Sequence, residues 1–467
     1  MSQLQRTLSF KATYAIVVGS VIGSGVFMKP AVMAGQLGSA WLLILVWIVA
    51  GLITLFGALS NAEAAAMFPE TGGQYVFFQK MYGEGFAFVY GWSAFAVFNT
   101  AGNASIAYVC AQYTEYFLQL PRFSQAIEQS LHIPIPLIGA IYPLENIGVK
   151  SLTIFLVVLF TAINYFSVHY GSGLQRILTA LKVLAIVLVV LGILFSGKGD
   201  WTNLQSTTVT ELNWLTAFMA AMAGAFWAYD GWNNITFIAG EVREPQRHIP
   251  KSLLLGLLTC ISIYVLINLA FVYVLPLSAM TQSSFVASDA GKIALGTIGG
   301  GLIALLVILS TLGTTNANIL STARVTFALG KASDRLNWVG KVQPRYQTPG
   351  NALWLNAGWS ILLIFSGSFD MLTDMLIFVS WFFYGMSALG IIRLRRTMPD
   401  AARPYRVWAY PWPTILFVVF TAVFLVATLY TDIRLYQEGK SHLINAAFGM
   451  LIAGLGIPLY FISRKQR

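Results

Sequence analysis

The sequence predicts an all-α membrane protein of twelve transmembrane helices, arranged as two five-helix repeats of opposite topology followed by two additional helices. Hydrophobic residues make up 57% of the 467 positions, charged residues only 10%, and the mean hydropathy is +0.71. Apolar runs of about 20 residues, the length that crosses a bilayer, recur along the chain. Two of these runs, the first and the sixth, are interrupted by glycines at corresponding places, which is typical of a membrane protein built from an internal repeat.

Twelve apolar segments account for the predicted spans, and their short connections leave no room for a separate soluble domain. The segments cover 13–34, 41–67, 85–118, 150–168, 175–196, 214–239, 250–275, 302–330, 351–368, 370–393, 411–431 and 442–462. Residues 1–467 therefore form one domain, in which 1–200 hold the first repeat, 201–395 the second and 396–467 the additional helices. Because each repeat has an odd number of spans, the second repeat begins on the opposite side of the membrane.

Two connections have features of their own. The segment 119–149 contains four prolines, and we expect it to fold back on the protein outside the membrane. The segment 285–298 is mildly amphipathic, which indicates a short surface helix.

The net charge of +10 comes from an excess of Lys and Arg, and the distribution of these residues along the chain indicates the reason for it. With both termini cytoplasmic, as in a plasma or inner membrane, most basic residues fall in cytoplasmic connections, as the positive-inside rule requires. Nucleic acid is therefore not an expected partner. An arginine cluster behind the tenth span fits a stop-transfer flank, with contact to anionic lipid as the alternative. It comprises Arg393, Arg395, Arg396, Arg403 and Arg406.

The first interrupted span reads Gly-Ser-Val-Ile-Gly-Ser-Gly over 19–25. At bilayer depth an unwound backbone persists only where it is buried in protein or lines a cavity. Gly23 and Gly25 leave room around the backbone, and Ser24 adds a hydroxyl. The N–H groups at the head of the following half-helix, with the helix dipole behind them, suit a carboxylate.

The second interrupted span covers 224–231 and offers backbone carbonyls that suit an ammonium group. The two interruptions together predict a site for a zwitterionic α-amino acid, with a seam of small residues between packed helices as the alternative. The predicted binding residues are Val21, Ile22, Gly23, Ser24, Gly25, Phe226, Trp227, Ala228 and Asp230.

Lys182 is predicted to be the basic residue that lies within a span. A charge at that depth is costly and by default indicates function, although its stem could instead carry the amine to the interface. We expect its ammonium to take the place of a metal cation and to tie the fifth span to the first interruption. Hydroxyls of the eighth span complete this predicted coupling site, namely Ser310, Thr311, Thr314 or Thr315.

Asp230 and Trp227 stand beside the second interruption. Asp230 is expected to cap freed backbone N–H groups, or alternatively to face a cationic side chain of the substrate. Trp227 is a candidate lid over a substrate-sized gap. No nucleophile–base pair and no metal-ligand spacing of histidines is present, so we expect no catalytic residue, metal or cofactor, and no enzymatic activity. A ring of charges, which an ion channel would need, is also missing from the sequence pattern.

At these positions the sequence resembles the L-type amino acid transporter family of the amino acid/polyamine/organocation superfamily. The matching segments are 19–27 (GSVIGSGVF), 175–182 with its lysine, 227–233 (WAYDGWN), 240–250 (GEVREPQRHIP) and 403–406 (RPYR). They follow the order of the family over nearly the whole chain.

The resemblance implies a LeuT-type fold that works by alternating access around one amino acid site. Ser24 and Gly25 then correspond to the donors to the substrate carboxylate, and the carbonyls of Val21, Trp227 and Asp230 to the acceptors from its amino group. Trp227 corresponds to the aromatic gate.

Lys182 corresponds to a lysine that replaces sodium, which favours sodium-independent exchange. Small or medium neutral amino acids are the expected substrates. Proton-coupled symport and exchange of cationic amino acids remain the alternatives.

One departure from the family concerns a partner. Animal members are joined to a heavy chain through a cysteine in the connection between the third and fourth spans, and none occurs between Gln119 and Val149. We therefore expect no disulfide-linked heavy chain and a bacterial protein that works alone, with its amino acid substrate and membrane lipid as partners.

Overall fold

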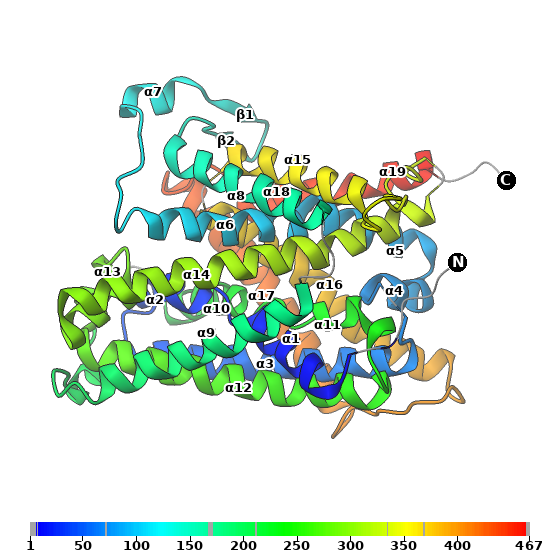
Figure 1. Cartoon of the computed structure of the whole chain (residues 1–467), viewed down its shortest axis with the longest axis horizontal. Coiled ribbons are helices and arrows are strands. Elements are labelled where there is room, and N and C mark those ends of the chain that lie inside the picture. The colour runs from blue at the N-terminus through cyan, green and yellow to red at the C-terminus, as the bar shows by residue number, and fades with distance from the viewer. Residues whose placement is uncertain are drawn as a thin grey trace.

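The computed structural model describes residues 6, 8–70, 72–166, 171–210, 213–333, 335–367 and 369–463, with only the backbone described for 171–178. The described chain is almost wholly helical, and its long helices run side by side along one direction (Figure 1). The helices of the first half are α1 (Phe10–Val21), α2 (Gly25–Leu37), α3 (Ala40–Met67), α4 (Gln74–Tyr82), α5 (Glu84–Ser93), the π-helix η1 (Ala94–Asn99), α6 (Thr100–Thr114), α7 (Gln125–Ser130), α8 (Ile147–Phe166) and α9 (Gly171–Leu194).

The described second half of the chain is also helical. It comprises η2 (Trp201–Gln205), α10 (Trp214–Tyr229), α11 (Asn234–Phe237), η3 (Ala239–Glu241), α12 (Pro245–Val274), α13 (Leu277–Gln282), α14 (Val286–Ala332), α15 (Gly350–Ser366), α16 (Phe369–Thr397), α17 (Trp412–Gln437), α18 (Asn445–Gly454) and α19 (Gly456–Ser463). Within α14, Gly296 has φ 81°, so two helices meet there. The first of them covers most of the short helix that the sequence predicts over 285–298.

Within the described ranges, nine helical segments are long and apolar enough to cross a membrane. The apolar helices Thr179–Leu194 and Trp214–Tyr229 are shorter. Each predicted span coincides with one of these eleven segments or with α15, except that residues 167–168 and 368 at two span ends lie outside the described chain. The chain is therefore a multi-pass helical membrane protein.

The connection 119–149 folds back, as the sequence predicts, but it is not irregular. It contains α7 and a small antiparallel hairpin of β1 (Ile133–Ile135) and β2 (Gly139–Ile141), the one sheet in the described residues. The Ile444 N–H donates to the Ile138 carbonyl at 2.8 Å, which fixes the hairpin to the connection between α17 and α18. The end of the helix bundle on which this hairpin lies is called the hairpin end below. The opposite end, where both ends of the chain lie, is the terminal end (Figure 1).

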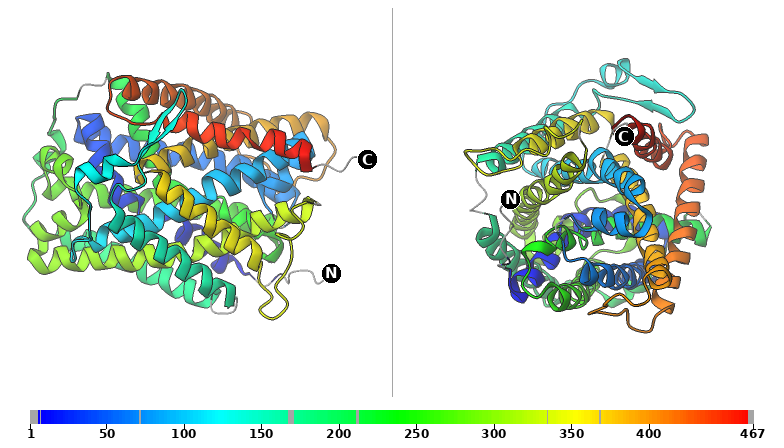
Figure 2. Two further views of the ribbon diagram at one scale, coloured as in Figure 1. Left: turned by 90° about the horizontal axis from the view of Figure 1, so that it is seen from above. Right: turned by 90° about the vertical axis from the view of Figure 1, so that its right-hand side faces the viewer.

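The most buried helices of the bundle are the interrupted helices and those packed beside them. In the most apolar window of the segment Glu84–Thr114, 89% of the residues are buried, and in that of Phe10–Leu37 72% are buried. The corresponding share is only 28% for α17 and for Asn445–Ser463, which lie at the periphery of the bundle (Figure 2). The two additional helices therefore flank the core and do not build it.

A buried carboxylate ties the bundle together at the terminal end. Glu63 of α3 is 1% exposed and receives two hydrogen bonds from Arg395, at 2.9 and 2.6 Å. Arg403 Nε lies 3.4 Å from the same carboxylate, and the Val407 N–H donates to it at 2.9 Å. Two arginines of the cluster that the sequence predicts as a stop-transfer flank, Arg395 and Arg403, therefore also pair with Glu63.

This cluster predicts the effect of Glu63→Gln. Because the change leaves the partly buried guanidinium groups of Arg395 and Arg403 without their anion, we expect the free energy of unfolding to fall by about 3 kcal/mol. Thermal or denaturant unfolding in detergent measures it. The matched control is Glu115→Gln, whose partner Arg122 is 56% exposed, and for this surface pair we expect a loss below about 1 kcal/mol. Equal effects of the two changes would contradict the structural role of Glu63.

Candidate functional site

The predicted interruption of the first span is present between α1 and α2. Helix α1 ends at Val21, Ile22 adopts extended φ/ψ angles of −71° and 90°, and α2 begins at Gly25. The first N–H groups of a helix have no acceptor within it. In the described chain the Ser24 and Gly25 N–H groups donate no backbone hydrogen bond, so the head of α2 offers free donors.

The interruption of the sixth span is also present, but it lies later than the sequence suggests. Gly224 is helical, and α10 continues to Tyr229. A Cβ on Gly224 would lie 3.2 Å from Met33 Cγ, so this glycine makes room for α2 and does not break α10. The chain leaves the helix at Asp230 and turns at Gly231, where φ is 94°, before α11 begins at Asn234.

The two interruptions touch each other, which explains two of their glycines. A Cβ on Gly25 would lie 2.5 Å from Ala228 Cα, and one on Gly231 would lie 2.7 Å from the Ser20 carbonyl oxygen. Any larger residue would push the helices apart. The hydroxyl of Tyr264, on α12, lies 2.7 Å from the Val21 carbonyl oxygen and 2.8 Å from that of Ala228, and so bridges both interruptions.

A cavity of about 60 Å³ lies where the interruptions meet. Its wall includes both interruptions, the segment from η1 into α6, and parts of α14 and α16. Seven of the nine predicted binding residues line it. They are Val21, Gly23, Ser24, Gly25, Trp227, Ala228 and Asp230.

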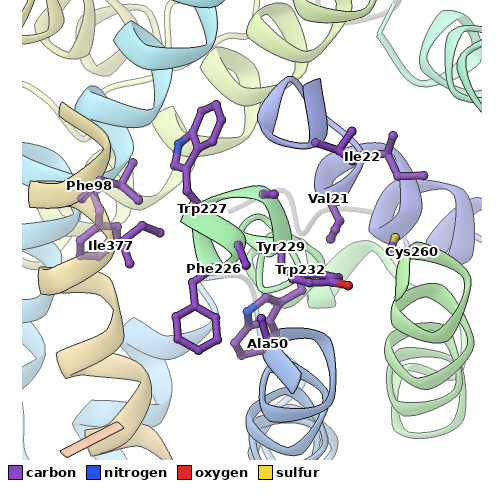
Figure 3. Packing of buried hydrophobic residues seen from close by; sticks show 14 of the residues in the cluster. Val21, Ile22, Ala50, Phe98, Phe226, Trp227, Tyr229, Trp232, Cys260 and Ile377 are labelled. Carbon is purple, nitrogen blue, oxygen red and sulfur yellow. The ribbon is translucent and has the colours of Figure 1, made fainter. Parts of the chain in front are cut away.

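The other two predicted binding residues are not in the wall of the cavity. Ile22 has a fully buried side chain, and its carbonyl accepts a hydrogen bond from Lys182. Phe226 stacks on Trp381 with 3.6 Å between ring centroids, and it points from α10 to the side opposite Trp227 (Figure 3). The reason is helical geometry, since neighbouring residues on α10 face directions about 100° apart.

Several polar side chains line the cavity, among them those of Ser24, Asp230 and Tyr384. The Ser24 hydroxyl is buried and has no hydrogen-bond partner among the described residues. The Asp230 carboxylate accepts a hydrogen bond of 2.8 Å from the hydroxyl of Tyr384 on α16. Because buried polar groups usually have partners, the free Ser24 hydroxyl at the head of α2 is a candidate contact for a ligand.

Lys182 reaches the first interruption, where its amine donates to the Ile22 carbonyl at 2.7 Å and to the Thr314 hydroxyl at 2.8 Å. It does not pair with the other predicted hydroxyls. Thr311 donates to carbonyls of its own helix, and the Ser310 hydroxyl has no partner in the described chain. The side chains of residues 175–178, which precede Lys182 in the family-like segment, lie outside the described structure.

Sequence reasoning overlooked Lys29, which lies within the predicted first span and is buried in α2. Its amine forms an ion pair of 2.7 Å with Asp370 at the start of α16 and lies 4.7 Å from the centre of the Phe369 ring. Phe369 in turn packs edge-on against Trp227 at 5.0 Å. These residues cover the cavity toward the hairpin end. The position of Lys29 inside an apolar segment was the signal that could have found it.

Amide side chains close the cavity toward the terminal end. Asn233 donates to Gln74 at 2.8 Å and accepts from Asn61 at 2.6 Å, and all three are buried. The hydroxyl of Tyr90, another residue of the cavity wall, lies 3.2 Å from the same Gln74 oxygen. No apolar pattern in the sequence distinguishes these residues from ordinary polar positions near helix ends.

The arrangement defines a class of protein. Two broken helices meet at a cavity inside a membrane-spanning bundle, and within the described ranges no group of three His, Cys, Asp or Glu residues could hold a metal. A buried site with separate coverings toward the two ends of the molecule is the architecture of a secondary transporter.

Comparison with known proteins identifies the family. Residues 8–455 match the family described as amino acid permease, and the chain belongs to that family. Similar proteins include the serine/threonine exchanger SteT of Bacillus subtilis, 26% identical over 99% of this chain and 98% of the relative. The mouse b(0,+)-type amino acid transporter 1 is 27% identical over 91% and 82%, and the human large neutral amino acids transporter small subunit 2 is 28% identical over 98% and 80%. The family and the transport of amino acids that the sequence predicts are thereby confirmed.

The covering at the hairpin end predicts the effect of Asp370→Asn. Loss of the anion weakens the attraction that holds α2 to α16, so a state open toward the hairpin end gains population. We expect roughly a fivefold faster reaction of a cysteine placed at Leu376, in the cavity wall, with a membrane-impermeant thiol reagent. The factor is modest because Asp370 is 57% exposed and its charge is partly screened by water.

The measurement uses a chain in which Cys110 and Cys260, both free and buried, are replaced by alanine. Asp200→Asn is the control, since Asp200 is an exposed acid that caps η2 and does not line the cavity. An unchanged rate for Asp370→Asn would show that the ion pair does not hold the cavity closed.

Proposed function

We propose that this chain exchanges small or medium neutral L-amino acids across a plasma (inner) membrane by alternating access and without sodium. The observation that carries the proposal is the cavity at two touching helix interruptions, with the free Ser24 hydroxyl and the free N–H groups at the head of α2 on its wall. An α-amino acid is the solute whose two charged ends match donors on one side and carbonyls on the other.

In this proposal the head of α2 binds the substrate carboxylate. The Ser24 and Gly25 N–H groups and the Ser24 hydroxyl donate, and the positive end of the helix dipole adds to the attraction. The substrate ammonium lies at the carbonyls of Val21, Trp227 and Asp230. Tyr264 already occupies one lone pair of the Val21 oxygen, and the second lone pair remains for the substrate.

Lys182 supplies the positive charge that a sodium ion provides in other transporters of this general design. Its amine joins the first interruption to α14, so movement of α9 or α14 is transmitted to the substrate site. An ammonium group supplied by the protein removes the need for a bound metal ion. Ser310 and Thr311, one turn before Thr314 on α14, are available to the amine in other states of the transport cycle.

We also propose that the helices follow the LeuT-type arrangement, with twelve spans, inverted repeats and both termini cytoplasmic. Two features support it, namely the matched interruptions at the head of each repeat and the peripheral position of α17 and α18–α19. The hairpin end then faces outward, and Trp227 is the gate on that side. No disulfide-linked heavy chain is expected, because the connection that carries α7 has no cysteine.

Exchange, in preference to one-way transport, is supported by two coverings of the cavity that both consist of tightly paired groups. The relative SteT is by its name an exchanger of serine and threonine. Proton-coupled symport is the rival, and Asp230 on the cavity wall favours cationic amino acids as the alternative substrates.

Countertransport in liposomes tests the proposal. We expect uptake of labelled serine or alanine to be fast when the vesicles contain unlabelled amino acid, slow when they are empty, and equal with and without sodium. Uptake into empty vesicles that follows an imposed pH gradient would favour the symporter. A competition panel of the twenty amino acids separates neutral from cationic substrates.

A second prediction concerns Lys182→Ala. The change removes both hydrogen bonds of the amine, and we expect exchange to fall by about tenfold or more, the effect of losing a buried charged hydrogen bond. Leu184→Ala is the control, since Leu184 lies on the same helix and is 54% exposed toward lipid. Normal exchange without any new sodium dependence in Lys182→Ala would refute the proposed role.

A further inference from the structure

We propose that Asn99 recognises the side chain of the transported amino acid, so that the preferred substrates are small amino acids with an oxygen in the side chain, such as serine, threonine or asparagine. This inference rests on the proposed function, because it places the substrate head at the two helix interruptions. It adds a choice among the neutral amino acids that the head contacts alone cannot make.

The first support is a missing hydrogen bond. The Asn99 side chain is 6% exposed, lines the cavity, and its Nδ2 has no partner among the described residues. Of the described residues in the cavity wall, only Ser24 and Asn99 have a buried side-chain atom left in this way. Since buried donors without an acceptor are costly and rare, the cavity is built to receive an acceptor at Asn99.

The local backbone gives the second support. Asn99 ends the π-helix η1, and the Thr100 hydroxyl donates to the Phe95 carbonyl five residues before it at 2.7 Å. A π-helical turn inserts an extra residue into a helix and so changes the direction in which the following side chains point. Such turns occur often at functional sites. Here the turn stands directly before the face of α6 that borders the cavity.

The surroundings of Asn99 set the size of the side chain. Gly102 and Ile106, one and two turns further along, share its face of the helix and line the cavity. A Cβ on Gly102 would lie 3.4 Å from Leu376 Cδ1, so the glycine leaves space in front of an apolar wall. Short side chains fit this space, and their oxygen would find Asn99 as its partner.

A neighbouring asparagine shows what a structural role looks like. Asn103 lies one turn after Asn99, accepts from Asn318 at 2.8 Å and does not line the cavity. Its Nδ2 donates to the Thr322 hydroxyl at 3.4 Å, so the Asn103 amide has partners within the protein both as a donor and as an acceptor. Asn99 has the same amide without such a partner. A side-chain oxygen of the substrate can accept a hydrogen bond from its free Nδ2.

The experiment compares substrates of the same shape. Serine and 2-aminobutyrate differ only by an oxygen in place of a methyl group, and so do threonine and valine. In countertransport we expect the wild type to prefer the oxygen-containing member of each pair by about tenfold or more. When the other member is bound, the Asn99 amide has no hydrogen-bond acceptor. In Asn99→Leu, which replaces the amide by an apolar group of similar size, we expect this ratio to fall to about one.

The control is Ser105→Ala, on the same helix, whose hydroxyl bonds the Ala101 carbonyl and does not line the cavity; its ratio should equal that of the wild type. If Asn99→Leu fails to reach the membrane, Asn99→Ala removes the amide without added bulk and is judged by the same ratio. Exchange with equal rates for the two members in the wild type, or an unchanged ratio without the amide, would overturn the inference. Absence of countertransport for every amino acid would instead overturn the proposed function.

Discussion

The rest of this structure depends on one constraint, which is that backbone groups at bilayer depth must find partners within the protein. The two interrupted helices free several carbonyls, and side chains from other helices serve them. Tyr264 serves Val21 and Ala228, and Lys182 serves Ile22. The N–H donors at the head of α2, by contrast, have no acceptor of this kind. This asymmetry leaves free N–H donors at one place on the cavity wall.

The partners of the freed carbonyls also connect helices that are far apart in the sequence. Lys182 belongs to α9 and touches the first interruption and α14, while Tyr264 belongs to α12 and touches both interruptions. A ligand that draws the interruptions together therefore acts on three further helices through hydrogen bonds. Because these bonds are buried, breaking them is costly, which favours a few discrete arrangements over a continuous range.

The two coverings of the cavity differ in chemistry. Toward the hairpin end the cover is aromatic and ionic, with Trp227, Phe369 and the Lys29–Asp370 pair. Toward the terminal end it is a network of neutral amides around Asn233. Ion pairs near water weaken with salt, whereas buried amide networks do not depend on it in the same way. The opening steps at the two ends should therefore respond differently to ionic strength.

The sequence by itself determined the membrane class, the positions of the spans and the presence of both helix interruptions, because hydrophobic length and glycine spacing are local properties. It also singled out Ser24, Trp227 and Lys182, since polar or bulky residues inside apolar runs stand out. Only the tertiary structure decided that α10 continues through Gly224, that Phe226 faces away, and that Lys182 meets Thr314. It likewise revealed Tyr264, Lys29 and Asn99. These roles depend on which distant helix lies opposite, and no local pattern encodes that.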